Sequence, residues 1–358
     1  MPHHLRSFIA TVAVVSLLTA CGGAAPNAGP SDAASEAFTY SGSDRDAYLA
    51  SCAAQEGSLT WYTSLAGDVV DAMIGAFNEK HPDVKVEAYR GEQTDIVSRV
   101  YQEAQANRLQ GDVVEVTSDG FRQLAEMKTI GVFSSPATAN TSARFTLKGD
   151  DGGTLGVGDR ASYVSFAYNT DKLPAAAVPR RLEDLLNPAL KGAVALTDST
   201  TGVRFVGNVL QILGDEKGRE FLTSLAAQNV RIEAVSGSAL AGLIATGEVT
   251  SSPGIFRNHA EQEISNGARV KWVPLEPVTA NVGYAGVFGK AAHPCAAMLF
   301  LDTLLGSTGG QVYEGLQYPR PDDDLGFASW VPDETFKTTD DYNEAFNTWR
   351  SLFEENFR

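Results

Sequence analysis

The segment 199–202 (Ser-Thr-Thr-Gly) combines three hydroxyl groups with a glycine between an expected strand at 193–197 and an expected helix at 202–213. Free backbone N–H groups and the helix dipole make such a helix start a natural site for an anion. Capping of the helix by Ser199 or Thr200 is the alternative, and both roles can coexist in one turn. We interpret this turn as a candidate anion site.

Two further polar turns follow expected strands. Thr63-Ser64 follows a strand at 58–62, and Thr117-Ser118-Asp119 follows a strand at 112–116. Ligands of open α/β sheets lie off the carboxyl ends of the strands, which makes both turns candidate binding segments. The alternative for each is that these residues only begin the next helix.

The tetrapeptide Leu18-Thr19-Ala20-Cys21 ends a short apolar run at 8–18. The run is about half the ~20 residues that a membrane-spanning helix needs, so residues 1–20 are interpreted as a cleaved signal peptide. The four residues resemble a lipobox, whose cysteine receives lipid after cleavage. Residues 21–43, rich in Gly, Ala, Pro and Ser at their start, are expected to form a flexible tether. An ordinary secretory signal that contains a cysteine is the alternative.

Composition restricts the partners. The formal net charge of −16 argues against binding of nucleic acid and against electrostatic binding to anionic lipid. It does not forbid an anionic solute, because the groups that line a pocket set its local field.

No zinc-type spacing of Cys or His occurs in the sequence, and we expect neither a metal nor a cofactor. With Cys21 lipidated, Cys52 and Cys295 are free to form a disulfide, or remain two unrelated thiols.

Strand and helix patterns alternate from residue 44 onward. This order predicts an α/β fold with mostly parallel sheets covered by helices. About 320 residues after the tether exceed one ordinary core, so two lobes are expected. Residues 134–158 break the pattern and are interpreted as an irregular segment. The aromatic residues of 342–357 recur at helical spacing, which predicts an amphipathic C-terminal helix that packs on the body.

Several phrases occur in an informative order: LTWYTSL at 59–65, GDVVEV at 111–116, FAYNTDKL at 166–173, KWVPLEPV at 271–278 and AHPCAAMLFLDTLL at 292–305. Together they resemble the extracellular solute-binding proteins of ABC importers, in the branch with the periplasmic ferric-ion-binding proteins. The resemblance implies a type II periplasmic-binding-protein fold with two lobes, two hinge crossovers and a ligand cleft between the lobes. Lobe 1 is then expected at 44–160 and 280–358, and lobe 2 at 161–279.

The resemblance also assigns a role to the segment 253–259. In the ferric branch this stretch carries two adjacent tyrosines that bind the metal, whereas here the matching positions hold Arg257 and Asn258. Arginine repels a cation and favours bidentate capture of carboxylate or phosphate. Ser162 and Tyr284 are expected near the hinge. The predicted ligand-binding residues are Thr63, Ser64, Ser118, Asp119, Ser162, Ser199, Thr200, Thr201, Gly202, Arg257, Asn258 and Tyr284.

The leading hypothesis is a monomeric, lipid-anchored receptor that delivers a small anionic solute to an ABC permease outside the cytoplasmic membrane. A phosphonate, a sugar phosphate or a carboxylate fits this expectation. A ferric complex that includes an anion is the second hypothesis. A surface hydrolase is a third, and it is disfavoured because the sequence has no G-x-S-x-G elbow, P-loop or catalytic His motif. A surface or sensory protein that has lost transport is a fourth.

Overall fold

The computed structural model describes residues 36–336 and 338–358. The expected signal peptide, Cys21 and most of the expected tether lie outside the described residues. Within the described ranges, no helix combines the length and the apolar character needed to cross a bilayer.

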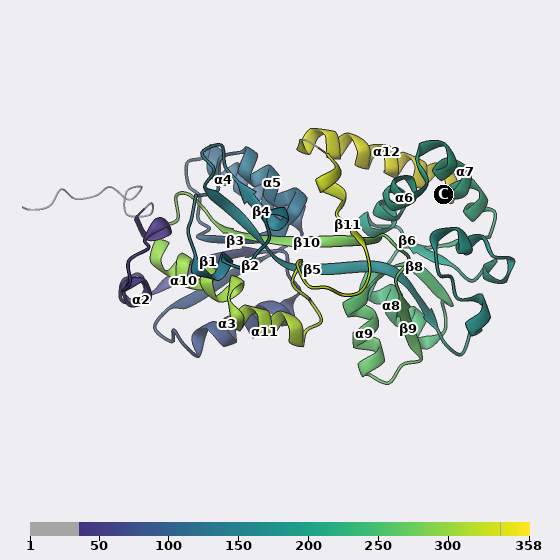
Figure 1. The fold of residues 1–358 in the computed structure, drawn as a ribbon, viewed down its shortest axis with the longest axis horizontal. Helices are drawn as coiled ribbons and strands as arrows, with labels where there is room; N and C mark the ends of the chain where they lie inside the picture. The colour runs from purple at the N-terminus through teal and green to yellow at the C-terminus, as the bar shows by residue number, and fades with distance from the viewer. Residues whose placement is uncertain (1–35, 337) are drawn as a thin grey trace, which may run out of the picture.

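The molecule has two α/β lobes side by side, joined by two long strands (Figure 1). Lobe 1 contains β1 (Ser58–Thr63), β2 (Lys85–Arg90), β3 (Val113–Thr117), β4 (Thr146–Lys148), α2 (Arg45–Glu56), α3 (Gly67–Asn78), α4 (Gln93–Gln105), α5 (Ser118–Glu126), α10 (Pro294–Leu305), α11 (Ser307–Gly315) and the 3₁₀ turns η1 (Pro136–Thr138) and η2 (Ala143–Phe145). Lobe 2 contains β6 (Ala195–Thr197), β7 (Arg231–Glu233), β8 (Ser251–Phe256), β9 (Val270–Val273), α6 (Thr200–Leu213), α7 (Asp215–Ala226), α8 (Gly237–Thr246), α9 (Arg257–Ser265) and the 3₁₀ turns η3 (Ala175–Ala177), η4 (Leu182–Leu186) and η5 (Pro188–Leu190).

The crossover strands are β5 (Thr154–Asn169) and β10 (Val278–Val287), which pair antiparallel. The first half of β5 pairs with β4, and its second half pairs with β8 and β9 of lobe 2. Ser162 of β5 faces Asn281 of β10 where the strands pass between the lobes. The two hinge crossovers that the resemblance implied are therefore β5 and β10.

The sheets are mixed. β2, β1 and β3 run parallel, as do β6 and β7, whereas β10 is antiparallel to both β3 and β5. The expected fold class is confirmed, with a smaller parallel share than the alternating pattern predicted. One crossover leaves lobe 1 and the other returns to it, so the two must run in opposite directions.

β5 begins within the segment that was expected to be irregular. Gly156 pairs with Leu147 of β4, and a Cβ at Gly156 would lie 2.2 Å from the ring of Phe121. Glycine weakens an isolated strand, but here it lets Phe121 pack flat on the sheet. The glycines therefore mark close packing within a strand, which the local sequence does not reveal.

Two apolar layers cover the sheet of lobe 1. Trp61 and Tyr62 are adjacent on β1 and point to opposite faces, as the pleat requires. Trp61 packs with Phe77 of α3 and Phe300 of α10, while Tyr62 packs in the layer formed by α4 and α5. A disulfide between Cys52 and Cys295 joins α2 to α10. Its closed loop spans 243 residues, for which the chain-entropy description gives about 5 kcal/mol of stabilisation.

The C-terminal helix α12 (Thr339–Phe357) packs on lobe 2, not on lobe 1 as expected for residues 280–358. Its Trp349 and Phe353 enter the apolar core formed by α6 and α7, and Figure 1 shows α12 running beside these two helices. Its first turn is held by lobe 1, where Thr339 Oγ1 donates to Glu126 of α5 at 2.8 Å. After β11 (Ser329–Trp330) and η6 (Pro332–Thr335), the chain therefore crosses between the lobes a third time.

Candidate functional site

A cleft of about 630 Å³ lies between the lobes. Both lobes, the crossover strands and α12 contribute to its lining. The side chains that carry the following argument are Ser64, Arg90, Glu92, Gln93, Asp119, Arg160, Ser162, Thr200, Thr201, Arg204, Asn258, His259, Asn281, Tyr318 and Tyr342.

Lobe 1 presents the carboxyl ends of its parallel strands to the cleft. Ser64 follows β1, Glu92 follows β2 and Asp119 follows β3. Arg90, the last residue of β2, donates through Nε to the carbonyl of Leu65 at 2.7 Å. Its guanidinium therefore has further N–H groups for other acceptors. This edge supplies one cation and two carboxylates.

Asp119 connects the two lobes. Its carboxylate accepts hydrogen bonds from Gln93 Nε2 at 2.9 Å and from Thr117 Oγ1 at 2.8 Å. Its third partner is Arg204 of lobe 2, at 3.4 Å. The short contacts hold Asp119 in lobe 1, and the longer ion pair bridges the cleft.

Lobe 2 presents the start of α6. Ser199 caps this helix by accepting the N–H of Thr201, while Thr200 and Thr201 line the cleft. Arg204 follows one turn later, so it lies on the same face as these hydroxyls. The helix start, its two hydroxyls and one guanidinium therefore converge on the cleft.

The guanidinium of Arg204 has few close partners. It donates to the phenol oxygen of Tyr342 at 3.2 Å and pairs with Asp119 at 3.4 Å. Its side chain is 16% exposed, so solvent and a solute can reach it. Burial acts to lower its pKa, but Tyr342 and Asp119 outweigh this effect and raise the pKa. Arg204 is therefore charged and only loosely paired.

Arg160 of β5 forms the floor of the cleft and is paired from below. It contacts the fully buried Glu115 at 2.9 Å, and Thr63 donates to the other oxygen of that carboxylate at 2.8 Å. Burial raises the pKa of Glu115 to about 7, although the Arg160 guanidinium acts in the opposite direction. Asp159, which accepts a hydrogen bond from Tyr313, also has a pKa raised by burial. Two buried carboxyls thus share one arginine.

The start of α9 closes another end of the cleft. Asn258 donates to the phenol oxygen of Tyr318 at 3.2 Å, linking lobe 2 to the segment after α11. His259 also lines the cleft, and burial lowers its pKa, which keeps the imidazole neutral. This end is polar but uncharged at neutral pH.

The structure brings half of the twelve predicted ligand-binding residues to the cleft: Ser64, Asp119, Ser162, Thr200, Thr201 and Asn258. Thr63 lies beneath it, bonded to Glu115, and Ser118 donates to Asp333 at 2.7 Å. Ser199 is the cap of α6. A Cβ at Gly202 would lie 2.1 Å from the carbonyl oxygen of Thr197, so this glycine permits close packing of helix on strand.

The remaining two predicted residues also lie elsewhere. Tyr284 is buried in lobe 1 against Phe121. The Arg257 guanidinium sits 5.9 Å from the ring of Trp272 and 3.8 Å from Glu261, at a separate groove outside the cleft. Phe256 and Asn258, its chain neighbours, face the cleft. Arg257 points elsewhere because successive positions at a helix start project in different directions.

Several cleft residues were not among those predicted. Arg204 carried a usable signal, since it follows Thr200 and Thr201 by four and three residues on one helix face. Arg90 ends a parallel strand, so the same rule that selected Ser64 also applies to it. Arg160, Asn281, Tyr318 and Tyr342 reach the cleft only through long-range pairing of β5 with β10 and packing of the C-terminal segments.

The family profile described as bacterial extracellular solute-binding protein matches residues 72–316, about two thirds of the chain. This chain belongs to that family. The resemblance to the solute-binding proteins of ABC importers is thereby confirmed. An uncharacterized protein of Haemophilus influenzae strain Rd is 28% identical over 265 residues, which cover 72% of this chain and 75% of the relative.

Solved structures share the fold. The periplasmic binding protein AfuA from Actinobacillus pleuropneumoniae, with fructose-6-phosphate bound, has a TM-score of 0.68 at 23% identity, over 84% of this chain and 99% of AfuA. Iron-bound HitA from Pseudomonas aeruginosa has a TM-score of 0.64 at 21% identity, over 82% and 99%. The spermidine/putrescine transporter protein PotD from Streptococcus pneumoniae has 0.68 at 14% identity, over 84% and 99%. These structures hold different ligands: fructose-6-phosphate in AfuA, iron in HitA, and calcium and HEPES in PotD.

Proposed function

We propose that this protein captures a small anionic solute that also carries hydroxyl groups, of the sugar phosphate class, and delivers it to an ABC permease. The observation that carries the proposal is the convergence of Arg204, Thr200 and Thr201 at the start of α6, facing the cleft. The guanidinium can bind two anionic oxygens at once. The helix start adds backbone N–H donors and a favourable dipole.

The lobe 1 side of the cleft favours hydroxyl groups on the same solute. Beside the single cation Arg90, Asp119 and Glu92 are acceptors that would repel a bare anion placed against them. A hydroxyl instead donates to such carboxylates, and Gln93 adds an amide with both donor and acceptor atoms. A solute with its anionic end on α6 and its hydroxyls toward lobe 1 satisfies both sides. The structure of AfuA, which shares this fold, has fructose-6-phosphate bound.

Ferric ion is the second candidate, because HitA with iron bound also shares this fold and two tyrosines line the cleft here. Both phenol oxygens already accept hydrogen bonds, Tyr318 from Asn258 and Tyr342 from Arg204. Burial raises the pKa of both tyrosines, which opposes formation of the phenolates that Fe³⁺ prefers. The arginine beside Tyr342 further disfavours a cation.

Transport requires capture and release, which a two-lobed protein achieves by shifting between open and closed arrangements. β5 and β10 are the strands about which the lobes would rotate. We assign no catalytic role to the cleft residues.

We further propose that lipid on Cys21 holds the receptor on the outer side of the cytoplasmic membrane. Mass spectrometry of the protein extracted from its host membrane would detect the acyl mass.

A thermal-shift panel of fructose 6-phosphate, glycerol 3-phosphate, methylphosphonate, citrate and ferric citrate tests the proposal. A ligand at a thousandfold excess over its Kd stabilises the folded state by about 4 kcal/mol. We expect the largest shift with a phosphorylated sugar. No shift with any phosphate, together with a coloured complex on addition of ferric ion, would overturn the proposal in favour of iron.

A further inference from the structure

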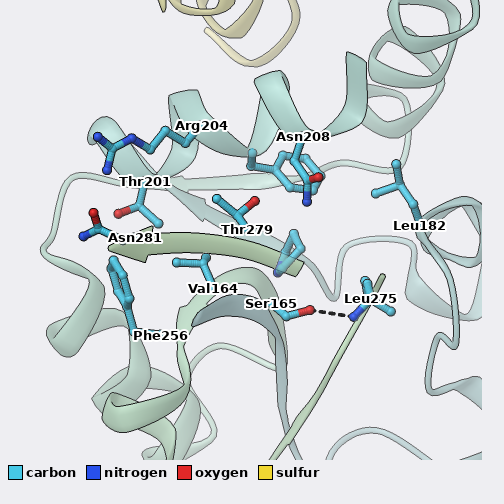
Figure 2. A pocket seen from close by; sticks show the side chains of 12 residues that line it. Val164, Ser165, Leu182, Thr201, Arg204, Asn208, Phe256, Leu275, Thr279 and Asn281 are labelled. Carbon is cyan, nitrogen blue, oxygen red and sulfur yellow. Dashed lines mark hydrogen bonds between the residues drawn. The ribbon is translucent and has the colours of Figure 1, made fainter. Parts of the chain in front are cut away.

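A second, smaller pocket opens from the cleft between α6 and the crossover strands (Figure 2). It shares Thr201, Arg204, Phe256 and Asn281 with the cleft, so these four side chains form the boundary between the two. Figure 2 shows Arg204 and Asn281 at one end of this pocket and Leu182 and Leu275 at the other. Its volume is about 20 Å³, enough for a single water-sized group.

Asn208 projects from α6 into this pocket (Figure 2). It follows Arg204 by four residues and therefore lies on the same helix face, one turn further from the cleft. The residue is 8% exposed, and within the described part of the chain nothing donates a hydrogen bond to its Oδ1. A buried acceptor without a donor costs free energy, and the amide Nδ2, which Figure 2 shows on the pocket side, adds two N–H donors, so the amide favours a group that can both donate and accept a hydrogen bond.

The walls restrict what can enter. Val164, Phe205, Leu182 and Leu275 make the pocket mainly apolar, and Ser165 Oγ accepts the N–H of Leu275 at 2.7 Å while its own O–H can still donate. The Arg204 guanidinium at the mouth repels an ammonium group. A neutral donor of one non-hydrogen atom fits these walls, and a hydroxyl is that group.

Resting on the proposed function, we propose that this pocket receives the hydroxyl nearest the anionic group of the solute. The anion binds Arg204 at the mouth, and the hydroxyl donates to Asn208 Oδ1. Thr279 on β10, whose side chain also lines the pocket, supplies a second hydroxyl beside it. Asn208 is therefore a specificity-determining residue that selects hydroxylated anions over their deoxy analogues, because a methyl group would leave Oδ1 unpaired.

Calorimetry with two phosphate esters of equal size tests this assignment. In 2-hydroxyethyl phosphate a hydroxyl ends the chain, and in propyl phosphate a methyl group replaces it. The wild-type protein is expected to prefer the hydroxyl ester by at least about fivefold, the lower end for a buried unpaired acceptor. Asn208→Leu is expected to abolish or reverse this ratio, and Asn208→Ala serves if the leucine variant does not fold. The ratio within one protein cancels general changes in affinity.

Asn356→Leu makes the same replacement on α12, where Asn356 bonds to Leu352 and Thr223, and is expected to keep the wild-type ratio. Equal affinities of the two esters in the wild type, or a preference that survives Asn208→Leu, would overturn the assignment. Tighter binding of 2-aminoethyl phosphate than of the hydroxyl ester would overturn the choice of hydroxyl. If fructose 6-phosphate, inorganic phosphate and both esters all fail to bind, the proposed function fails and the assignment falls with it.

Discussion

Arg160 and Arg204 both line the cleft and both have a raised pKa, yet their surroundings differ. Arg160 is 2.9 Å from a fully buried Glu115, with Asp159 adjacent in the chain. Arg204 is 3.4 Å from Asp119 and is more exposed. An arginine in a binding cleft therefore serves structure or solute according to its existing partners. Arg160 therefore belongs to the floor of the cleft, and we propose Arg204 as the cation that meets the solute.

The largest expected effect is on folding, from Arg160→Met. This change leaves Glu115 buried without its cation, and loss of one partner of a buried pair destabilises by about 3–5 kcal/mol. Urea denaturation measures the free energy of unfolding. The double variant Arg160→Met/Glu115→Gln is expected to recover part of the loss. A destabilisation below about 1 kcal/mol would place Arg160 with Arg204 as a free, solute-facing cation.

Arg204→Ala is expected to act on binding. Loss of a charge-assisted contact to an anion corresponds to about 2–3 kcal/mol, or roughly a 100-fold weaker Kd for fructose 6-phosphate. Calorimetry measures the affinity, and the free energy of unfolding should change far less than in Arg160→Met. Arg219→Ala, which removes an exposed arginine of α7, is the control. Unchanged affinity in Arg204→Ala would break the comparison.

A pH titration of stability tests the role of Arg160 through its buried partner Glu115. Because burial raises the pKa of Glu115 to about 7, the folded state binds more protons than the unfolded state between about pH 4.5 and 7. The free energy of unfolding contributed by this group is full below the unfolded pKa and falls as pH rises toward 7. One proton sets an upper slope of about 1.4 kcal/mol per pH unit.

Glu115→Gln is expected to remove most of this slope, and denaturation curves from pH 5 to 7.5 measure the difference. The charged and titratable groups around Glu115 are Arg160, Asp159 and Tyr313. Parallel pH curves for the variant and the wild type would show that Glu115 does not titrate in this interval.

The smallest effect is expected for Arg257→Ala. This arginine was predicted to bind the anion, but it stacks near Trp272 outside the cleft. Its removal is expected to change the affinity for fructose 6-phosphate by less than about twofold, as for most surface changes. A loss as large as that in Arg204→Ala would instead restore the sequence-based assignment and move the anion toward α9.

Arg204 and Arg257 also differ in how well local sequence patterns predict their positions. The turn before α6 was found because hydroxyls at a helix start carry a local signal, and helical periodicity extends that signal to Arg204. The neighbours of Arg257 in the sequence do line the cleft, but the direction of one side chain at a helix start depends on the groups packed around it. Here the ring of Trp272, which lies on β9, packs against the Arg257 guanidinium.

The C-terminal helix α12 was predicted as a helix but was expected on the wrong lobe. Amphipathic spacing correctly predicted the helix of α12, but it could not say which lobe would receive the apolar face. Gly207 decides part of this, because a Cβ there would lie 2.8 Å from the ring of Trp349. The glycine opens a flat surface on α6 that the tryptophan covers, and nothing near residue 349 indicates it.

The sequence by itself determined the alternation of strands and helices, the family and the polar turn at the start of α6. These follow from periodicity, capping chemistry and phrase order, all of which act over a few residues. Only the tertiary structure decided that Arg204 lines the cleft, that Arg160 pairs with Glu115, and that Asn208 lines a small pocket next to the cleft. Each of these depends on which distant groups approach each other, and strand pairing together with helix packing over the whole chain sets that.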